Sequence, residues 1–344
     1  MTFGGSDQAV VEALRITAQS RSSSPPPTVP LRCQKVVTSP KRHHVVPRFY
    51  LDRFARDGYL WVYDRERDEY RHQAPVNTAV YRHYYTFTDA SGQRSTEVES
   101  MLARVEAGTK PILDNLDAHQ LPSPEERALL ASFAAFQLTR VPGFEHMVTD
   151  VLSTIVKQMM RTSFADVERA KASLRRTARS DKPPVDPQAM VDFVRDEAYE
   201  LKINRNASLA QMLSLAIEIG PILASLSWVF VYTPAKKSYV TSDNPFTVIA
   251  PAAPKGGSQY GVGILTPGAG KFLPLGPSVA LLMGDPGSAT ISRQARESLV
   301  RDINLAVTAK CERYVFAREE RLLRNLVEHT NLANRDRPPR TRAL

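Results

Sequence analysis

The sequence predicts an α+β fold in which an N-terminal β-hairpin is followed by a central helical region and a C-terminal, mainly antiparallel sheet with one inserted helix. Two observations indicate this class. Aromatic and β-branched residues gather between polar turns near the start of the chain and again after Ser227, whereas apolar residues between these regions repeat at helical spacing. Strands and helices also do not alternate regularly, as they would in a wound parallel sheet.

The predicted hairpin lies at residues 58–72. An aromatic and β-branched run at 59–63 leads into charged residues at 64–69, which suit a turn, and Tyr70 then resumes the strand composition. We therefore expect a small sheet at the start of the folded chain.

Helices dominate the middle of the chain, beginning with apolar residues at helical spacing over 97–116. The next helix has a clear start, because Ser123 and Glu126 form a Ser-x-x-Glu capping box around Pro124. We expect this helix to run to Arg140 and to stop before Pro142. Further helices are predicted over 145–179, as one helix or a pair, 187–203 and 208–226.

The composition returns to β-type after Ser227, where Pro, Gly and Ser punctuate runs of Val, Tyr, Phe and Leu. We expect a helix over 293–308, inserted between the last two strands, and no internal repeat is visible. The predicted strands are 228–232, 238–241, 271–275, 279–283 and 314–317.

Composition divides the chain into three parts. Residues 1–40 contain a Ser- and Pro-rich segment that predicts a flexible leader, residues 41–330 predict one folded domain, and residues 331–344 predict a basic flexible tail. A chain of 344 residues is long enough to bury a substantial core.

The charge and the cysteine content limit which partners and which cellular compartment the sequence favours. The formal net charge of +9 and the pI of about 9.6 favour nucleic acid or another polyanion as a partner. Only Cys33 and Cys311 are present, so we expect no disulfide framework and a reducing compartment. The apolar stretch 209–226 is interrupted by polar residues, and the N-terminus lacks a secretory signal pattern, so the sequence predicts a cytoplasmic protein with no membrane partner.

Several short motifs occur together in the part predicted to fold. In chain order they are His-His-Val-Val-Pro at 43–47 with Tyr50, Leu51 and Phe54 after it, Phe136-Gln137-x-x-Arg140, Ser-Asp-Asn-Pro at 242–245, Leu-Pro-Leu-x-Pro at 273–277, and Asn304. In this combination the chain resembles, over roughly residues 41–317, a bacterial family known as domain of unknown function 4238. The resemblance transfers no mechanism, because the family has no assigned activity.

His43 and His44 are the sharpest candidates for chemistry. Adjacent imidazoles can offer one ring to a divalent ion, Mg²⁺ or Mn²⁺, and the other to a phosphate or a water. The His-His-Val-Val-Pro string is similar to the first element of His-Asn-His nucleases, but the later elements fit poorly, since Asn77 and His83 are their only candidates. The alternative is that both histidines bond to backbone and pack the start of the domain.

Arg48, Tyr50 and Arg140 are candidate phosphate contacts. If residues alternate as in a strand, Arg48 shares a face with Tyr50 and His44, which places a guanidinium and a phenol beside the imidazole. Arg140 ends a predicted helix, so it either contacts a substrate or caps the free carbonyls of that helix.

Carboxylates complete the candidate site. Asp243 and Asn244 belong to the segment 242–245, whose composition favours a turn between two predicted strands. There Asp243 could ligate a metal or simply shape the turn. Glu99 and Glu106, on the helix predicted over 97–116, are expected to form a solvated face.

Three functional hypotheses remain open from the sequence. The first is a divalent-metal-dependent hydrolase acting on nucleic acid, with the site residues His43, His44, Arg48, Tyr50, Arg140, Asp243 and Asn244. In that hypothesis His44 is general base or ligand, and His43 and Asp243 are metal ligands. The second is a non-catalytic nucleotide-binding or polyanion-binding protein, and the third is a protein-interaction module whose motifs are purely structural.

Overall fold

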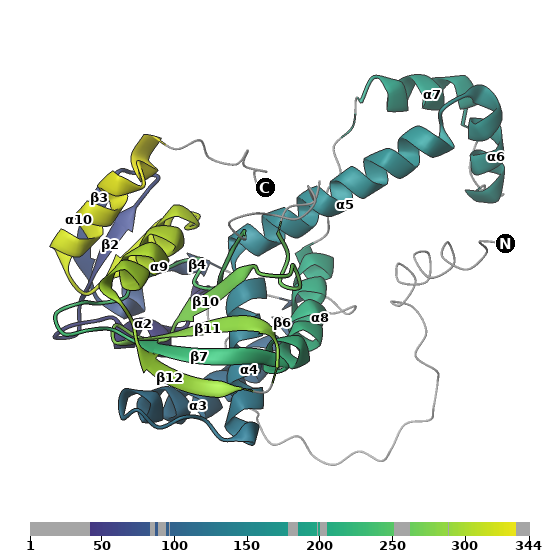
Figure 1. The fold of residues 1–344 in the computed structure, drawn as a ribbon. Helices are drawn as coiled ribbons and strands as arrows, with labels where there is room; N and C mark the ends of the chain where they lie inside the picture. The colour runs from purple at the N-terminus through teal and green to yellow at the C-terminus, as the bar shows by residue number, and fades with distance from the viewer. Residues whose placement is uncertain are drawn as a thin grey trace, which may run out of the picture.

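The computed structural model has a rounded body and a helical arm that projects from it (Figure 1). The α+β class predicted from the sequence is confirmed. The predicted leader and most of the predicted tail lie outside the described residues. These are 42–334 without 83–86, 89–93, 96, 178–184, 198, 200–204, 251–261 and 288.

The body begins with β1 (Arg42–His44), which pairs antiparallel with β4 (Val80–Arg82). The short helix α2 (Arg48–Arg53) follows, and the predicted hairpin is confirmed as β2 (Leu60–Asp64) and β3 (Glu69–Gln73). The 3₁₀ helix η1 (Pro75–Asn77) then leads into β4.

The hairpin is half of a four-stranded sheet with the order β3-β2-β13-β8. Its other strands come from the distant C-terminal half, as β13 (Tyr314–Ala317) and β8 (Thr241–Ser242). All three pairings are antiparallel. The two ends of the folded chain are therefore joined through one sheet.

A second, five-stranded sheet has the order β12-β7-β11-β10-β9 and is antiparallel except for the β12–β7 pair. The helix predicted to start at 293 starts at Glu297, because the preceding residues pair with β7. The strands are β7 (Leu226–Tyr232), β9 (Thr247–Ile249), β10 (Gly270–Pro274), β11 (Val279–Pro286) and β12 (Thr290–Gln294). A separate small ladder joins β5 (Phe87–Thr88) and β6 (Arg94–Ser95).

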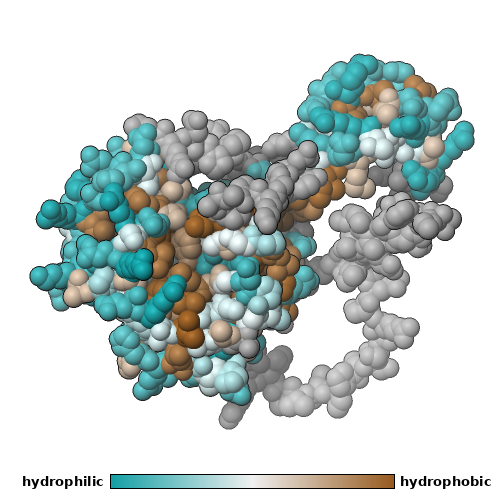
Figure 2. Space-filling model, in the orientation of Figure 1, coloured by the Kyte–Doolittle hydropathy of each residue, from teal (hydrophilic) through white to brown (hydrophobic). Residues whose placement is uncertain are grey.

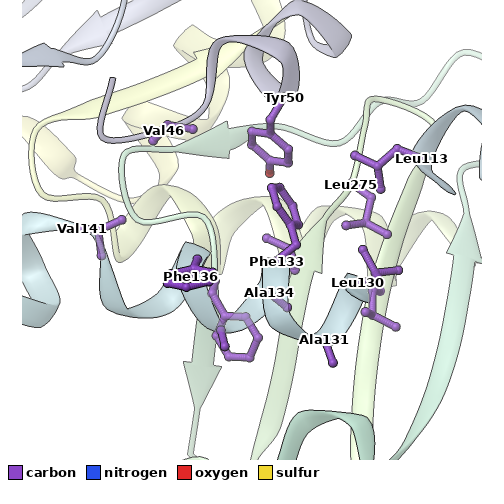
Figure 3. Close-up of a cluster of buried hydrophobic side chains, with 14 of the residues drawn as sticks. Val46, Tyr50, Leu113, Leu130, Ala131, Phe133, Ala134, Phe136, Val141 and Leu275 are labelled. Atoms are coloured by element: carbon purple, nitrogen blue, oxygen red, sulfur yellow. The ribbon is translucent and has the colours of Figure 1, made fainter. Parts of the chain in front are cut away.

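The main core lies where α4 (Pro124–Thr139) packs on α3 (Glu97–Asp117), α8 (Arg205–Ala224) and the five-stranded sheet. The predicted capping box is confirmed, since Ser123 accepts the Glu126 amide proton and the Glu126 carboxylate accepts that of Ser123. Figure 3 shows Tyr50 of α2 pointing at Phe133 of α4 in this core.

The arm consists of α5 (Pro142–Ser163), α6 (Val167–Thr177) and α7 (Pro187–Arg195) (Figure 1). Pro142, expected only to follow the preceding helix, is the first residue of α5, where its missing N–H is not needed. The helix predicted over 187–203 ends at Arg195, and 200–204 lie outside the described residues.

A smaller core cluster holds α9 (Glu297–Ala309) and α10 (Glu320–His329) against the four-stranded sheet, and η2 (Leu332–Asn334) closes it. Helix α10 follows β13 directly and was not predicted from the sequence. Within the described ranges, no helix has the length and apolar character that crossing a membrane requires.

Candidate functional site

His43 and His44 point to different partners. His43 is buried on β1, and its Nε2 lies 3.1 Å from Oε1 of Glu99 on α3. His44 is half-buried, and its Nδ1 lies 3.1 Å from the Thr78 carbonyl oxygen. Successive strand side chains face opposite sides, which accounts for the divergence of the two rings.

The strand alternation expected for Arg48 and Tyr50 is wrong, because both residues lie in helix α2 after Pro47. Arg48 is exposed and pairs with Asp52 at 3.6 Å. The Tyr50 side chain is buried, and its hydroxyl lies 2.8 Å from Oγ1 of Thr241. This burial raises the pKa of Tyr50 and places the phenol in the core rather than beside His44.

Arg140 is the C-cap of α4, as predicted, but its side chain turns inward. Its Nε donates to the Val45 carbonyl at 3.0 Å and its Nη1 to Oε1 of Glu106 at 2.8 Å. Glu99 and Glu106 therefore do not form the solvated face expected for them, because Glu99 contacts His43 and Glu106 contacts Arg140.

Asp243 is completely buried and accepts the backbone amide protons of the three residues before and at the start of β13. These bonds, from Glu312, Arg313 and Tyr314, measure 2.9, 2.8 and 3.0 Å. Burial raises the pKa of Asp243 to about 7, against the lowering effect of the three amides. Asn244 donates to the Lys310 carbonyl, so this motif fastens the loop between α9 and β13.

The metal site predicted from His43, His44 and Asp243 has no set of ligands that converges on one point. In the part of the chain that the structure describes, no group of three or more His, Cys, Asp or Glu side chains is placed to hold a metal ion. Asn77 lies in η1, whereas His83 falls outside the described residues. The catalytic and metal-binding roles of these residues stay predictions.

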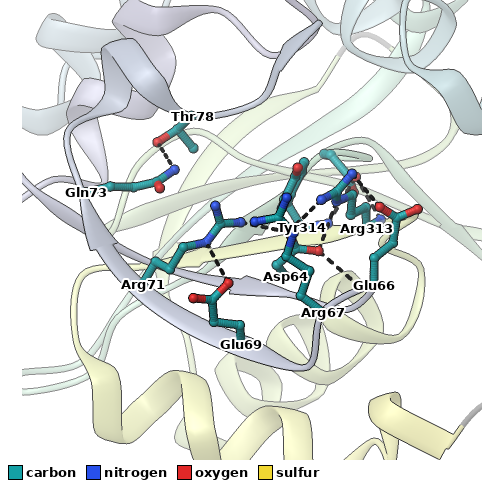
Figure 4. Close-up of polar contacts among 10 residues, drawn as sticks. Asp64, Glu66, Arg67, Glu69, Arg71, Gln73, Thr78, Arg313 and Tyr314 are labelled. Carbon is teal, nitrogen blue, oxygen red and sulfur yellow. Dashed lines mark hydrogen bonds and ion pairs between the residues drawn. The ribbon is translucent and has the colours of Figure 1, made fainter.

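A buried carboxylate that the sequence did not single out organises the four-stranded sheet (Figure 4). Asp64 ends β2 with no exposed surface and accepts two bonds from Arg313, at 2.9 and 2.7 Å. Arg71 of β3 adds a third charged bond at 2.7 Å, and the Glu66 amide adds a fourth at 3.1 Å. We call Asp64, Arg71 and Arg313 the Asp64 cluster.

A large cavity of about 980 Å³ lies between the loop after β7, the start of α9 and the junction of β13 with α10. Asn304 of α9 holds one wall in place, because its side chain accepts from the Val240 amide and donates to the Ser238 carbonyl. Pro277 and Asn304, two residues of the family-like motifs, line this cavity. We call it the cation cavity, since its lining includes Arg56, Lys236, Lys237, Arg301, Arg318 and Arg321.

The cation cavity contains more positive than negative charge. Among the residues that the structure describes, two carboxylates line it, and each has a partner: Glu297 pairs with Lys237 at 2.9 Å, and Glu319 with Arg56 at 3.5 Å. The other four cations have no carboxylate within 4.0 Å among the residues described. Burial, and to a smaller extent the neighbouring Arg56 guanidinium, lower the pKa of Arg318.

One residue that lines the cation cavity, Lys236, has a left-handed backbone. Lys236 has φ of +65° in a turn closed by a bond from the Lys237 amide to the Pro234 carbonyl. A lysine in this left-handed region carries a steric cost that glycine would avoid. Strained residues of this kind cluster at binding sites, where the surrounding structure holds them in place.

Sequence reasoning missed the cation cavity because its six cations come from distant segments between residues 56 and 321. The one local signal was the pair Lys236-Lys237 directly after a predicted strand and Pro234. Loops at strand ends often carry binding residues, so this pair could have been noted.

The comparisons with known proteins add a family and nothing more specific. No curated protein and no solved structure matches the chain. A family model described as "Protein of unknown function (DUF4238)" matches residues 42–321, which include all the motifs quoted above. The chain therefore belongs to the DUF4238 family.

Proposed function

We propose that this protein binds a small, multiply charged anion, such as a phosphorylated metabolite or nucleotide, in the cation cavity. The observation that carries the proposal is the charge of the lining. Among the described residues, the lining contains six cations and two carboxylates, and four of the cations have no carboxylate partner. An anion that carries several negative charges would balance them.

Phosphate suits this lining better than a single carboxylate would. Arginine presents a planar set of donors that matches two phosphate oxygens at once, and four of the six cations are arginines. The volume of about 980 Å³ is at the upper end of the range of about 300–1,000 Å³ that is typical of ligand cavities. A nucleotide or a sugar phosphate would fit such a space.

Binding without turnover is favoured over metal-dependent hydrolysis of nucleic acid. The His43 ring contacts the Glu99 carboxylate, and the Asp243 carboxylate accepts three backbone amide protons. Either side chain would have to give up these contacts to coordinate Mg²⁺ or Mn²⁺. Arg140 is likewise bound to Glu106 and to backbone. These contacts support structural roles for the motif residues.

Titration calorimetry with pyrophosphate, ATP and ribose 5-phosphate tests the proposal. We expect wild type to bind at least one of these ligands, and Arg301→Gln/Arg321→Gln to bind it at least about tenfold more weakly. A charged hydrogen bond contributes about 1.5–3 kcal/mol, and about 1.4 kcal/mol is tenfold in affinity. Both arginines are exposed, so the fold should tolerate their loss.

The matched control is Arg104→Gln/Arg293→Gln, which removes the same charge from exposed positions outside the cavity. If both double variants lose the same affinity for the anion, the loss is explained by net charge alone, and a specific site is contradicted. No binding of any of the three anions by wild type would also contradict it. Cleavage of DNA or RNA that is lost with chelator and in His43→Ala/His44→Ala would instead support the hydrolase.

A further inference from the structure

Three aromatic side chains stack on the hairpin of β2 and β3. The His72 ring contacts the other two, with its centroid 5.2 Å from that of Tyr59 and 4.8 Å from that of Trp61. Trp61 and His72 lie opposite one another in the ladder, so their side chains leave the same face of the sheet. We call Tyr59, His72 and Trp61 the aromatic stack.

The Tyr59 ring leaves room for a ligand. His72 stacks against it with an angle of 29° between the ring planes, and the Tyr59 side chain is still 48% exposed. At the other side of the stack, Trp61 is partly buried against the smaller core cluster, which holds the stack in place. An exposed aromatic ring in a fixed position offers a stacking surface to a flat group such as a nucleobase.

The aromatic stack and the cation cavity lie at the same end of the four-stranded sheet. Strands β8 and β2 begin at this end, and β13 and β3 finish there. The cavity-lining residues Ser238, Glu319 and Arg56 lie just outside the ends of β8, β13 and β2. Tyr59 directly precedes β2, and His72 is the last residue but one of β3. The stack therefore continues the row of lining residues along this end of the sheet.

Arg56 connects the two features. Its side chain lines the cavity and pairs with Glu319 at 3.5 Å, and its backbone exchanges two hydrogen bonds with Tyr59, of 2.7 and 3.0 Å. The neighbouring surface over α10 is mainly hydrophilic, as access for a charged ligand requires (Figure 2). A ligand whose phosphates lie in the cavity can therefore place its other end against Tyr59.

We propose that the ligand of the cation cavity is a nucleotide, with its phosphates among the cations of the cavity and its base stacked on Tyr59. This assignment rests on the anion-binding function proposed above, and the aromatic stack selects one class of anion. A sugar phosphate has no flat ring to cover Tyr59, whereas every nucleobase has a π-face that can stack there. The stack leaves a single ring exposed for a base, so a free nucleotide suits it better than a nucleic acid strand.

Calorimetry of the full chain with ATP and with tripolyphosphate tests the proposal, because both ligands carry a chain of three phosphates and only ATP has a base. We expect wild type to bind both, and ATP more tightly. Tyr59→Ala should weaken ATP binding at least about fivefold, as loss of one stacked base does, and change tripolyphosphate binding by less than about twofold. Tyr59→Leu fills a similar volume without a π-face and should behave like Tyr59→Ala. The matched control Tyr59→Phe keeps the ring and should bind both ligands as wild type does.

The outcomes separate this assignment from the anion site on which it rests. If wild type binds neither ligand, the anion site itself is contradicted, and the nucleotide assignment falls with it. If both ligands bind and Tyr59→Ala changes their affinities equally or not at all, the anion site stands and the nucleotide assignment is overturned. Tighter binding of a single-stranded oligothymidine than of ATP, lost in Tyr59→Ala, would assign the stack to nucleic acid and also overturn it.

Discussion

The Asp64 cluster and the cation cavity both gather arginines, but they differ in what neutralises them. In the Asp64 cluster a fully buried carboxylate accepts three charged bonds from Arg71 and Arg313, so the positive charges are satisfied within the fold. In the cation cavity four cations have no carboxylate within 4.0 Å in the described part of the chain.

The difference separates arginines that stabilise the fold from arginines that are available to a ligand. A buried charged network is costly to break once it is satisfied, because removing one member leaves its partners buried and uncompensated. Cations without a counter-charge destabilise the folded protein, because they repel one another until an anion binds. Substitutions in the two regions should therefore affect different measurements.

The largest effect is expected from Asp64→Ala. Removing this carboxylate leaves Arg71 and Arg313 without their main partner, and we expect a loss of about 3–5 kcal/mol in the free energy of unfolding, as for other broken buried pairs. Chemical denaturation measures it. Asp114→Ala, which removes a half-exposed carboxylate paired with Arg53 and Lys110, should cost less than about 1 kcal/mol. Equal losses would contradict the special role of Asp64.

The raised pKa of Asp243 leads us to expect that the stability of the protein depends on pH. Its pKa is about 7 in the fold against an ordinary value of 3.8, so the folded state holds this proton more tightly than the unfolded state does. The resulting stabilisation is complete below about pH 4 and is lost as the pH rises through 7, which amounts to about 4 kcal/mol. We expect the Tm of wild type to fall from pH 5 to pH 8.

Asp243→Asn is the control for this titration. The amide cannot ionise, so the fall in Tm between pH 5 and pH 8 should flatten. The Asn Nδ2 group would meet a backbone N–H in place of an acceptor, so the variant should also be less stable by about 1–3 kcal/mol. An unchanged pH profile in Asp243→Asn would assign the dependence to other groups.

The smallest effect is expected at Lys236. Lys236→Gly relieves the left-handed backbone and should raise the free energy of unfolding by about 1 kcal/mol, while it weakens anion binding through loss of the charge. Lys236→Ala keeps the backbone cost and loses the same charge, so it should weaken binding without the stabilisation. Denaturation and calorimetry on both variants measure the two effects. Unchanged affinity in both would remove Lys236 from the site.

The elements that the sequence predicted well have local causes. The hairpin at β2 and β3 and the capped start of α4 depend on residues within a few positions of one another, and the structure confirms both. The strand-like alternation considered for Arg48 and Tyr50 does not occur, and the reason is physical. Helix α2 forms there, and it buries Tyr50 and Leu51 in the core.

The site predictions failed to anticipate where the motif side chains would find partners. Arg140 and His43 bind Glu106 and Glu99 of a helix that looked solvated from its sequence. Asp64 and Arg313 are 249 positions apart, and no spacing rule relates them. Pairing of this kind is set by packing, which brings together residues that the sequence keeps far apart.

By itself the sequence determined the α+β class, the hairpin, most helix positions and the motifs that identify the family, because periodicity, caps and turn residues act over short distances. Only the tertiary structure decided which charged residues are neutralised inside the protein and which are not. Neutralisation depends on distances of a few ångströms between groups from separate segments, and the fold sets these distances.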